Sequence, residues 1–543
     1  MAQGIGDLDG AMLVVVVIGD GLVQGINRLT EAMIVIVDRA RDIADGIDGF
    51  YDAMVSIVFL LGGVPQCIDD AIHPTQSVQM GLAALAVRAN LGGQVQTTID
   101  GRGTPSTLTY DTRRNPDTAK VAAHPPVDRD HDDLGRLIQI TDQEGAITQY
   151  QYDARGNTTK IIDPLGHETN LTYDTLGRLN TVTDRNNDTS TISYTPSGQI
   201  QSVDYPGTKE DVTFIYDIYD QVSQMTDGLG TSSYQYDVLG RLTQTTDANG
   251  FTLQYQYDAN NNLTQLTYPD GNSVTYTYDA LNRLTQLTDW LGNDTDYHYD
   301  AAGRMIEMVH ANGITTTYSY DHANRLIGQT ATTSHGDILT HQDFVLDPNG
   351  NRILENRTQP QAPTDTAANE TYQYNPQKTR LETITDTETN KTETFTYNHE
   401  GQTIDKSGKA YTYDTRHRLI QQGTTHYHYD ATDNRLKVER AGTTIYYIYD
   451  SNNNLLAEAD GSKQIVRHYL HDSGLHSMIQ DGKAHIYHHS ATGHTLAMTN
   501  SNETVINQYA YSPYGRLLGE TETPGLEQLF KYVGKYGVQH EGD

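Results

Sequence analysis

The dipeptide Tyr-Asp returns at a fixed interval through the middle of the chain. It occurs at Tyr236-Asp237, Tyr257-Asp258, Tyr278-Asp279, Tyr299-Asp300 and Tyr320-Asp321, always 21 residues apart. A fixed period of this length is the signature of a repeat architecture, in which each supersecondary unit buries its faces only against its neighbours. The chain is therefore expected to fold as an array of similar units.

Each unit contains two turn signals of the form Asp-x-x-Gly, as at Asp237 to Gly240 and Asp247 to Gly250, with a strand-like run after each. The Asp carboxylate can accept backbone N–H groups across the bend, and the fourth residue must tolerate a positive φ. That position holds only Gly, Asn or Asp, which adopt positive φ most easily. After the tyrosine it is Gly135, Gly156, Gly177, Gly198, Asp220, Gly240, Asn261, Asn282, Gly303, Asn324 and Gly401; in the other turn it is Gly145, Gly166, Asn187, Gly230, Gly250, Gly292 and Gly313.

The runs between the turns alternate polar and β-favouring residues, which places Tyr276 and Tyr278 on one face of a sheet. Tyrosine ladders of this kind are expected to replace a conventional aliphatic core. The arginine after the turn is expected to lie near the turn Asp as a solvated charge that contributes little. The candidate structural residues of the repeat are Tyr152, Asp153, Gly156, Tyr173, Asp174, Gly177, Arg178, Tyr236, Asp237, Gly240, Arg241, Tyr257, Asp258, Tyr278, Asp279, Arg283, Tyr299, Asp300, Gly303, Arg304, Tyr320, Asp321 and Arg325.

The pattern Tyr-Asp-x-x-Gly-Arg-Leu with a period near 21 resembles the YD-repeat (Rhs) family over roughly residues 105–543. That family includes bacterial polymorphic toxins, the shell subunits of Tc toxins and the teneurin ectodomains. The resemblance implies a mainly β fold, a spiral of consecutive antiparallel hairpins. The family's Asp-Pro-x-Gly-Leu motif, its self-cleaving aspartates and its toxin domain have no counterpart in this sequence, so a truncated shell is expected.

Composition narrows the classes of partner. Lys plus Arg number 37 against 70 Asp plus Glu, a net charge of −33, which argues against nucleic acid because phosphate binding needs a basic face. Cys67 is the single cysteine, so no internal disulfide can form.

Residues 1–98 differ from the rest, because Tyr51 is the one tyrosine among the first 100 residues. Apolar residues recur there at steps of three and four, which predicts an amphipathic helical segment. This stripe comprises Met33, Val37, Ala40, Ala44, Ile47, Tyr51, Met54 and Val58. The start lacks a basic region typical of a secretory signal, and the longest uncharged stretch is too short to span a bilayer. A packing or oligomerisation segment is favoured over membrane contact.

The remaining chain divides by the regularity of its repeats. Residues 99–130 are expected to be an irregular linker or a degraded first repeat, 131–330 regular repeats, and 331–372 an irregular insertion. Residues 373–508 are expected to be divergent repeats, and 509–543 resemble the start of the Rhs core segment.

The sequence shows no motif that predicts catalysis. A nucleophile elbow, a phosphate loop and a zinc-protease helix are absent from it. His485, His488, His489 and His494 cluster, but a surface role or a substitution for repeat tyrosines is favoured over a metal site. The turn Asp184 to Asp188 lacks the rest of a calcium loop. No cofactor, metal or enzymatic activity is predicted.

The resemblance implies a non-enzymatic shell or scaffold that encloses or presents a C-terminal toxin or partner, in interbacterial or host-directed toxicity. Its partners would be a toxin domain or immunity and secretion proteins, with delivery to the cell surface or outside by a secretion system. The alternative is a surface or secreted adhesion module that binds glycans or proteins through exposed tyrosines.

Overall fold

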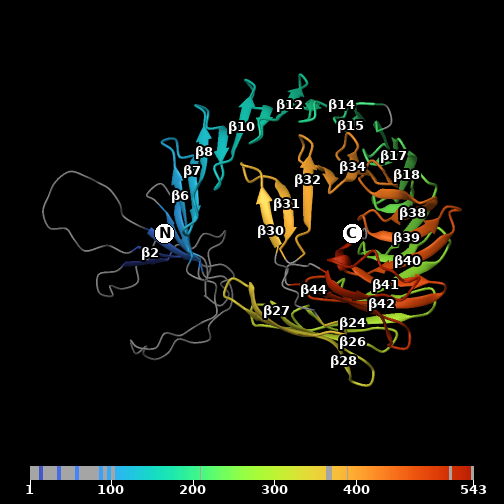
Figure 1. Cartoon of the computed structure of the whole chain (residues 1–543). Coiled ribbons are helices and arrows are strands. Elements are labelled where there is room, and N and C mark those ends of the chain that lie inside the picture. The colour runs from blue at the N-terminus through green and yellow to red at the C-terminus, as the bar shows by residue number, and fades with distance from the viewer. Residues whose placement is uncertain are drawn as a thin grey trace, which may run out of the picture. The chain divides into compact units, whose positions relative to one another are not determined.

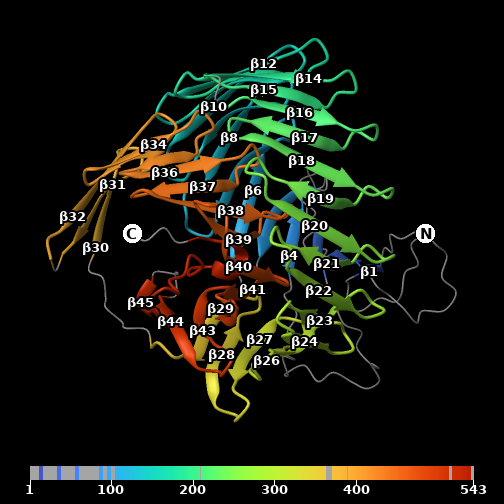
Figure 2. The same cartoon turned by 90° about the vertical axis from the view of Figure 1, so that its right-hand side faces the viewer.

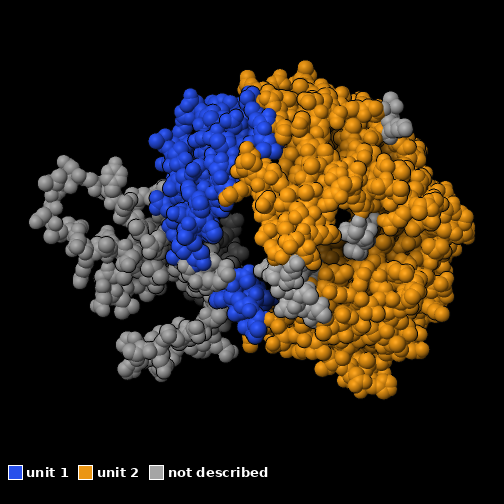
Figure 3. Space-filling view, viewed as in Figure 1, with its two compact units in different colours: residues 1–152, 161–166, 345–354 blue, residues 153–160, 167–344, 355–543 orange. Residues whose placement is uncertain are grey.

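The computed structural model describes residues 94–99, 104–207, 210–362, 370–387, 389–512 and 517–539, and the backbone of four strands nearer the N-terminus. The chain separates into two compact units (Figure 3). Unit 1 comprises residues 1–152, 161–166 and 345–354, and unit 2 comprises residues 153–160, 167–344 and 355–543. Each unit is described by itself.

The described elements are strands, apart from one short 3-10 helix, η1 (Gly534–Tyr536), so the predicted β fold is confirmed (Figure 1). The strands of unit 1 are β1 (Met12–Val15), β2 (Met33–Val37), β3 (Val55–Phe59), β4 (Leu85–Ala89), β5 (Val95–Ile99), β6 (Pro105–Tyr110), β7 (Pro116–Val121), β8 (Val127–His131), β9 (Leu137–Thr141) and β10 (Ile147–Tyr152). Three strands contain residues of both units: β11 (Thr158–Ile162), β28 (Ile338–Leu346) and β29 (Arg352–Thr358).

The other strands belong to unit 2 and form two consecutive series. The first series is β12 (Glu168–Tyr173), β13 (Leu179–Thr183), β14 (Thr189–Tyr194), β15 (Ile200–Asp204), β16 (Val212–Tyr216), β17 (Val222–Asp227), β18 (Gly230–Tyr236), β19 (Leu242–Thr246), β20 (Thr252–Tyr257), β21 (Leu263–Thr267), β22 (Ser273–Tyr278), β23 (Leu284–Thr288), β24 (Asp294–Tyr299), β25 (Met305–Val309), β26 (Thr315–Tyr320) and β27 (Leu326–Thr332). The second series is β30 (Glu370–Tyr374), β31 (Leu381–Asp386), β32 (Thr392–Tyr397), β33 (Thr403–Lys406), β34 (Lys409–Tyr413), β35 (Leu419–Gln422), β36 (Thr425–Tyr429), β37 (Arg435–Arg440), β38 (Thr443–Tyr449), β39 (Leu455–Asp460), β40 (Ile465–His471), β41 (Leu475–Gln480), β42 (Lys483–His489), β43 (Thr495–Thr499), β44 (Val505–Tyr511) and β45 (Leu517–Thr521).

The helical prediction for residues 1–98 is wrong where the structure describes that segment. Residues 33, 37 and 58 of the predicted helical stripe lie on strands β2 and β3, which pair antiparallel. The runs Met-Ile-Val-Ile-Val and Val-Ser-Ile-Val-Phe are rich in β-branched residues, whose strand preference outweighs the three-four spacing. The other five positions of the stripe lie outside the described residues.

Strands also occur in residues 99–130, predicted to be an irregular linker or a degraded first repeat, and in residues 331–372, predicted to be an irregular insertion. β6 and β7 lie within residues 99–130 and β8 begins there, and β28 and β29 lie within 331–372. Pro105 and Pro116 begin β6 and β7, where a strand tolerates proline. The domain limits given by the repeat pattern remain predictions.

Each Tyr-Asp turn of the described repeats contains a residue with positive φ just before the next strand, a geometry that joins adjacent antiparallel strands. In the turn between β22 and β23, the Asn282 N–H donates to the Asp279 carbonyl, and the Asp279 N–H donates to the Arg283 carbonyl. The strand register shifts beside Tyr278, as expected for a bulge. Every position predicted to have positive φ has it, including Asp220 at 61°. Elsewhere in the described chain the same position accepts Lys378, His417 and Glu503, so the restriction to Gly, Asn and Asp is not general.

The repeat tyrosine connects successive hairpins through its hydroxyl group. The Tyr278 hydroxyl donates to the Leu263 carbonyl at 3.0 Å, and its ring lies on the same face of β22 as that of Tyr276. The equivalent bonds run from Tyr152 to Leu137, Tyr173 to Thr158, Tyr236 to Val222, Tyr299 to Leu284 and Tyr320 to Met305. The tyrosine thus joins the end of its own strand to the first residue of the preceding strand.

The repeat arginine makes more contacts than a solvated charge would. Arg283 donates to the Asp279 carboxylate through Nε, at 2.7 Å, and Nη2, at 2.6 Å, and lies 4.6 Å from the centre of the Tyr299 ring. Hydrogen bonds from Arg283 lower the pKa of Asp279. Arg178, Arg241, Arg304 and Arg325 make the same pair with Asp174, Asp237, Asp300 and Asp321.

The two strand series of unit 2 pack face to face. β38 to β41 lie beside β19 to β22 (Figure 1, Figure 2). Leu253, Val274 and Leu287 of the first series contact a cluster with Ile448, Leu456 and Leu470 of the second. The other face of the second series packs around Tyr469, Met478 and Phe530. Because both faces are covered, β39, β41 and β43 are buried almost throughout, and small residues such as Ala457 and Ala497 allow this close packing.

The turn geometry predicts the effect of substituting Gly303. A Cβ there would meet only Arg283 Nη1, at 3.8 Å, so Gly303→Val tests the backbone conformation (φ 82°) rather than space. Gly303→Val should lower the free energy of unfolding by more than about 1 kcal/mol, because a β-branched residue is strained at positive φ. Gly303→Asn is the matched control and should lower the free energy of unfolding by only about a few tenths of a kcal/mol, because Asn tolerates positive φ. Equal midpoints of urea unfolding for the two variants would contradict the turn assignment.

Candidate functional site

A continuous row of polar contacts joins the two strand series within unit 2. We call this row the seam, and it runs from the Arg185–Glu400 pair to the Ser334–Glu503 contact. Contacting residues along it lie between 149 and 215 residues apart in the chain. On the first series, the seam uses the turns that lack the tyrosine; on the second, it uses mainly the tyrosine turns.

Most contacts at the seam are hydrogen bonds to turn backbone or turn side chains. The Ala431 N–H donates to Asp227 Oδ2 at 2.7 Å, and Lys463 Nζ donates to the Asn249 carbonyl at 2.6 Å. The buried Tyr268 hydroxyl donates to the Tyr469 carbonyl at 2.8 Å. Asn312 Nδ2 donates to Thr499 Oγ1 at 3.1 Å and to the Asn500 carbonyl at 2.9 Å. The seam therefore satisfies polar groups that would otherwise be buried unpaired at the turns.

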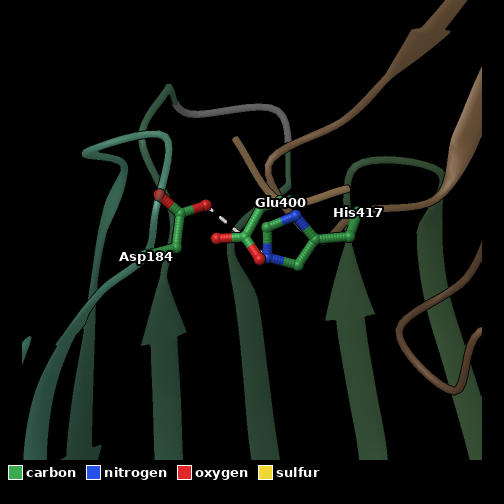
Figure 4. A group of neighbouring side chains, drawn as sticks. All are labelled: Asp184, Glu400 and His417. Atoms are coloured by element: carbon green, nitrogen blue, oxygen red, sulfur yellow. Dashed lines mark ion pairs between the residues drawn. The ribbon is translucent and has the colours of Figure 1, made fainter. Parts of the chain in front are cut away.

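Asp184, Glu400 and His417 meet at one end of the seam, and each comes from a different turn (Figure 4). Asp184 follows β13, Glu400 lies between β32 and β33, and His417 between β34 and β35. His417 Nε2 is 3.5 Å from Asp184 Oδ2, and Arg185 Nη2 is 2.8 Å from Glu400 Oε2. Burial, with Asp188 and Glu400 nearby, raises the pKa of Asp184.

The turn carboxylates of the seam differ in what binds their second oxygen. At Asp289 the first oxygen accepts two backbone N–H groups and the second accepts Asn293 Nδ2 at 2.8 Å. At Asp184 and Asp247 the residues four positions later are Asp188 and Phe251, whose side chains have no hydrogen-bond donor. Asp184 Oδ2 and Asp247 Oδ2 accordingly have no hydrogen-bond donor, and burial raises the pKa of Asp247 to about 6.

A cavity of about 210 Å³ adjoins the seam where β25 and β26 meet β41 and β42. His310, His476, His488 and His489 line it. The His310 ring is stacked on that of His476, with ring centres 5.2 Å apart, and lies 5.6 Å from that of His488. His310 is 3% exposed, and neither ring nitrogen has a hydrogen-bond partner. It occupies the position of the turn Asp in His310-Ala-Asn-Gly313, which is a departure from the repeat.

Burial keeps these histidines neutral. It lowers the pKa of His488 and His489 to about 3, and that of His310 and His476 below the ordinary range. Asp472 and Lys535 also line the cavity. The cavity therefore combines neutral imidazoles with one charged group of each sign.

His489 and a further buried histidine, His471, occupy positions that hold a tyrosine in other repeats. His489 Nε2 donates to the Leu475 carbonyl at 2.8 Å, and His471 Nε2 donates to the Leu455 carbonyl at 2.9 Å, the same kind of bond that Tyr278 makes. The four histidines singled out in the sequence do not meet at one point. His488 contacts Thr499, and His494 lies between the rings of Tyr511 and Tyr532.

The structure places the predicted repeat residues away from the seam. Those of the first series, from Tyr173 to Arg325, lie at the opposite ends of the strands, in the hairpin turns described above. The seam residues Asp184, His310 and Glu400 were not predicted as a site. One signal was available in the sequence, namely a break in the repeat, such as Asp188 or His310 where the pattern has a different residue.

Known proteins resemble this chain in its repeats and its fold. The family model described as RHS Repeat matches residues 131–168, 152–189, 216–252, 236–273, 257–295 and 299–338. The chain therefore contains Rhs repeats over these residues. Rhs repeats thus account for the Tyr-Asp period and for the hairpins that it encodes.

Among curated proteins, the tRNA3(Ser)-specific nuclease WapA of Bacillus spizizenii is 25% identical over 156 residues, 26% of this chain and 7% of the nuclease. Two solved structures resemble the fold, each with a TM-score of 0.53. One is a complex of TcdB2, TccC3 and Cdc42, with 15% identity over 84% of this chain and 32% of that one. The other is the Tc holotoxin pore of Photorhabdus luminescens, with 14% identity over 96% of this chain and 36% of that one. The Rhs-repeat chain therefore spans about a third of these structural relatives.

The described part of the chain contains no helix of the length and apolarity needed to cross a membrane.

The buried histidines predict a pH-dependent stability. In the unfolded chain a histidine takes up a proton below pH 6.5, whereas His310 in the folded chain stays neutral, so stability falls as the pH falls. Between pH 7.5 and pH 5.5, one such histidine lowers the free energy of unfolding by about 1.4 kcal/mol. His310→Asn restores a turn side chain of the repeat type without a titrating group. Urea unfolding at the two pH values should show that the variant loses about 1.4 kcal/mol less than the native chain. An unchanged pH dependence would contradict a neutral His310.

Proposed function

We propose that this chain is the structural shell of an Rhs-type protein and that it encloses or presents a toxin or another protein partner. The main support for this proposal is the seam. It joins strands that are 149 to 215 residues apart into one wall and gives unit 2 a core on each face of the second series. The repeats and the fold similar to Tc toxin structures support a scaffold of this class. In this proposal the chain has no enzymatic role and acts after export from the cell that makes it.

The alternative role as a glycan-binding surface module is less well supported by the tyrosines. Repeat tyrosines such as Tyr278, Tyr299 and Tyr320 use their hydroxyl groups in bonds to backbone carbonyls. Their rings lie partly buried, and those of Tyr299 and Tyr320 lie against arginines. A sugar would therefore meet turn tips rather than a ladder of open aromatic faces.

The seam can be tested by one substitution that preserves size. In Asn312→Asp the donor amide is replaced by a carboxylate that faces Thr499 Oγ1 and the Asn500 carbonyl. The loss of these two donated bonds should lower the free energy of unfolding by about 1–3 kcal/mol. Asn260→Asp is the matched control, because Asn260 is exposed at a turn on the opposite strand ends, and it should change stability by less than about 0.5 kcal/mol.

The shell function is tested by co-expressing the chain with the polypeptide encoded directly downstream of it. We expect the two to purify together and the second polypeptide to resist protease only in the presence of the chain. Asn312→Asp should reduce this protection, and Asn260→Asp should not. Separate elution with equal digestion rates would contradict the shell function, and strong glycan-array binding by the purified chain would then favour the adhesion module.

A further inference from the structure

Asp184, Glu400 and His417 present a set of metal-ligand atoms at the seam. One ligand atom from each residue lies within 4.8 Å of the others. The three side chains point toward one another across the seam, and in Figure 4 the Glu400 carboxylate lies between Asp184 and the His417 ring. The site holds one imidazole and two carboxylates, a donor set that suits a divalent transition metal.

The unpaired oxygen of Asp184 is an independent observation that points to a ligand. Asp184 is 8% exposed, and its Oδ2 is buried without a hydrogen-bond donor. His417 Nε2 lies 3.5 Å from this oxygen, which is too far for a strong hydrogen bond. The residue whose side chain would supply a donor in other turns is Asp188 here, so the turn itself supplies no donor to this oxygen.

The carboxylates are held in place by groups behind them. Asp184 Oδ1 accepts the N–H groups of Asn186, at 2.9 Å, and Asp188, at 2.8 Å. Glu400 accepts the Arg185 N–H through Oε1, at 2.5 Å, and Arg185 Nε through Oε2, at 2.9 Å. Outer contacts of this kind orient the ligands of metal sites in proteins.

The local charge also favours a cation. Asp184, Asp188 and Glu400 contribute three negative charges and Arg185 one positive charge, which leaves two negative charges when His417 is neutral. A divalent ion would neutralise this excess at a position where Asp184 is shielded from water.

We propose that Asp184, Glu400 and His417 bind a divalent transition-metal ion, with Zn²⁺ as the best match, and that the ion fastens the seam. Zn²⁺ accepts imidazole nitrogen and carboxylate oxygen together, whereas Ca²⁺ and Mg²⁺ prefer oxygen ligands alone. Three protein ligands leave a fourth position for water. The ion would join turns of the two strand series and stabilise the folded chain by binding to it selectively. This site does not depend on the proposed shell function.

The test is a Zn²⁺ titration of the full chain, stripped of metal with a chelator, by calorimetry and by thermal unfolding. The native chain should bind one equivalent of Zn²⁺ tightly and unfold at a higher temperature with it. His417→Ala and Asp184→Asn should each weaken that binding at least 10-fold and remove the thermal shift. With Co²⁺, the visible absorption bands of a bound ion should appear in the native chain and be lost in both variants.

Two matched controls separate this site from other histidines and from other unpaired carboxylates. His399→Ala removes the histidine next to Glu400, which stacks on His167, and Asp247→Asn removes the other unpaired turn carboxylate. Both controls should bind Zn²⁺ like the native chain. If Asp184→Asn fails to fold, the comparison of His417→Ala with His399→Ala still decides, because the His417 side chain is 40% exposed. No binding by the native chain, or equal Zn²⁺ affinity in His417→Ala, would show an ion-pair cluster only and overturn the proposal.

Discussion

The turn aspartate is the interaction on which the rest of the structure depends. Its first carboxylate oxygen accepts two backbone N–H groups across a bend, as Asp279 does from Leu281 and Arg283. This arrangement needs a residue with positive φ one position before the second donor, and it reverses the chain within a few residues. Repeated along the chain, it produces consecutive antiparallel hairpins in a fixed register.

The second oxygen of the same carboxylate differentiates the turns. In the tyrosine turns it binds an arginine or asparagine four residues later, and the arginine then lies over the next tyrosine, as Arg283 lies over Tyr299. At Asp184 and Asp247 no donor follows, and the free oxygen is buried at the seam. The turn carboxylate is thus left without a donor to its second oxygen wherever the residue four positions later departs from the pattern.

The seam explains how a polar repeat protein acquires a core. The regular repeats expose one face of each strand, whereas β39, β41 and β43 are covered on both faces and carry small and apolar residues. This packing buries polar groups at the turns, and hydrogen bonds across the seam satisfy such groups as the Tyr268 hydroxyl and the Asn312 amide. The proposed shell function and the proposed metal site both rest on this junction, the first on its continuity and the second on the carboxylate that it leaves unpaired.

The sequence by itself determined the hairpins, because the turn chemistry is local. The period, the positive φ at positions such as Gly240 and Asn282, and the shared face of Tyr276 and Tyr278 all follow from contacts within a few residues or one repeat. Sequence reasoning was wrong for residues 33, 37 and 58, where β-branched runs outweighed a helical spacing. Only the tertiary structure decided which turns meet. Asp184 and Glu400 are more than 200 residues apart, and their approach depends on how many strands the chain passes before it returns beside itself. Whether the two turns meet therefore depends on the summed twist and packing of many strands, which cannot be inferred from the sequence of a single repeat.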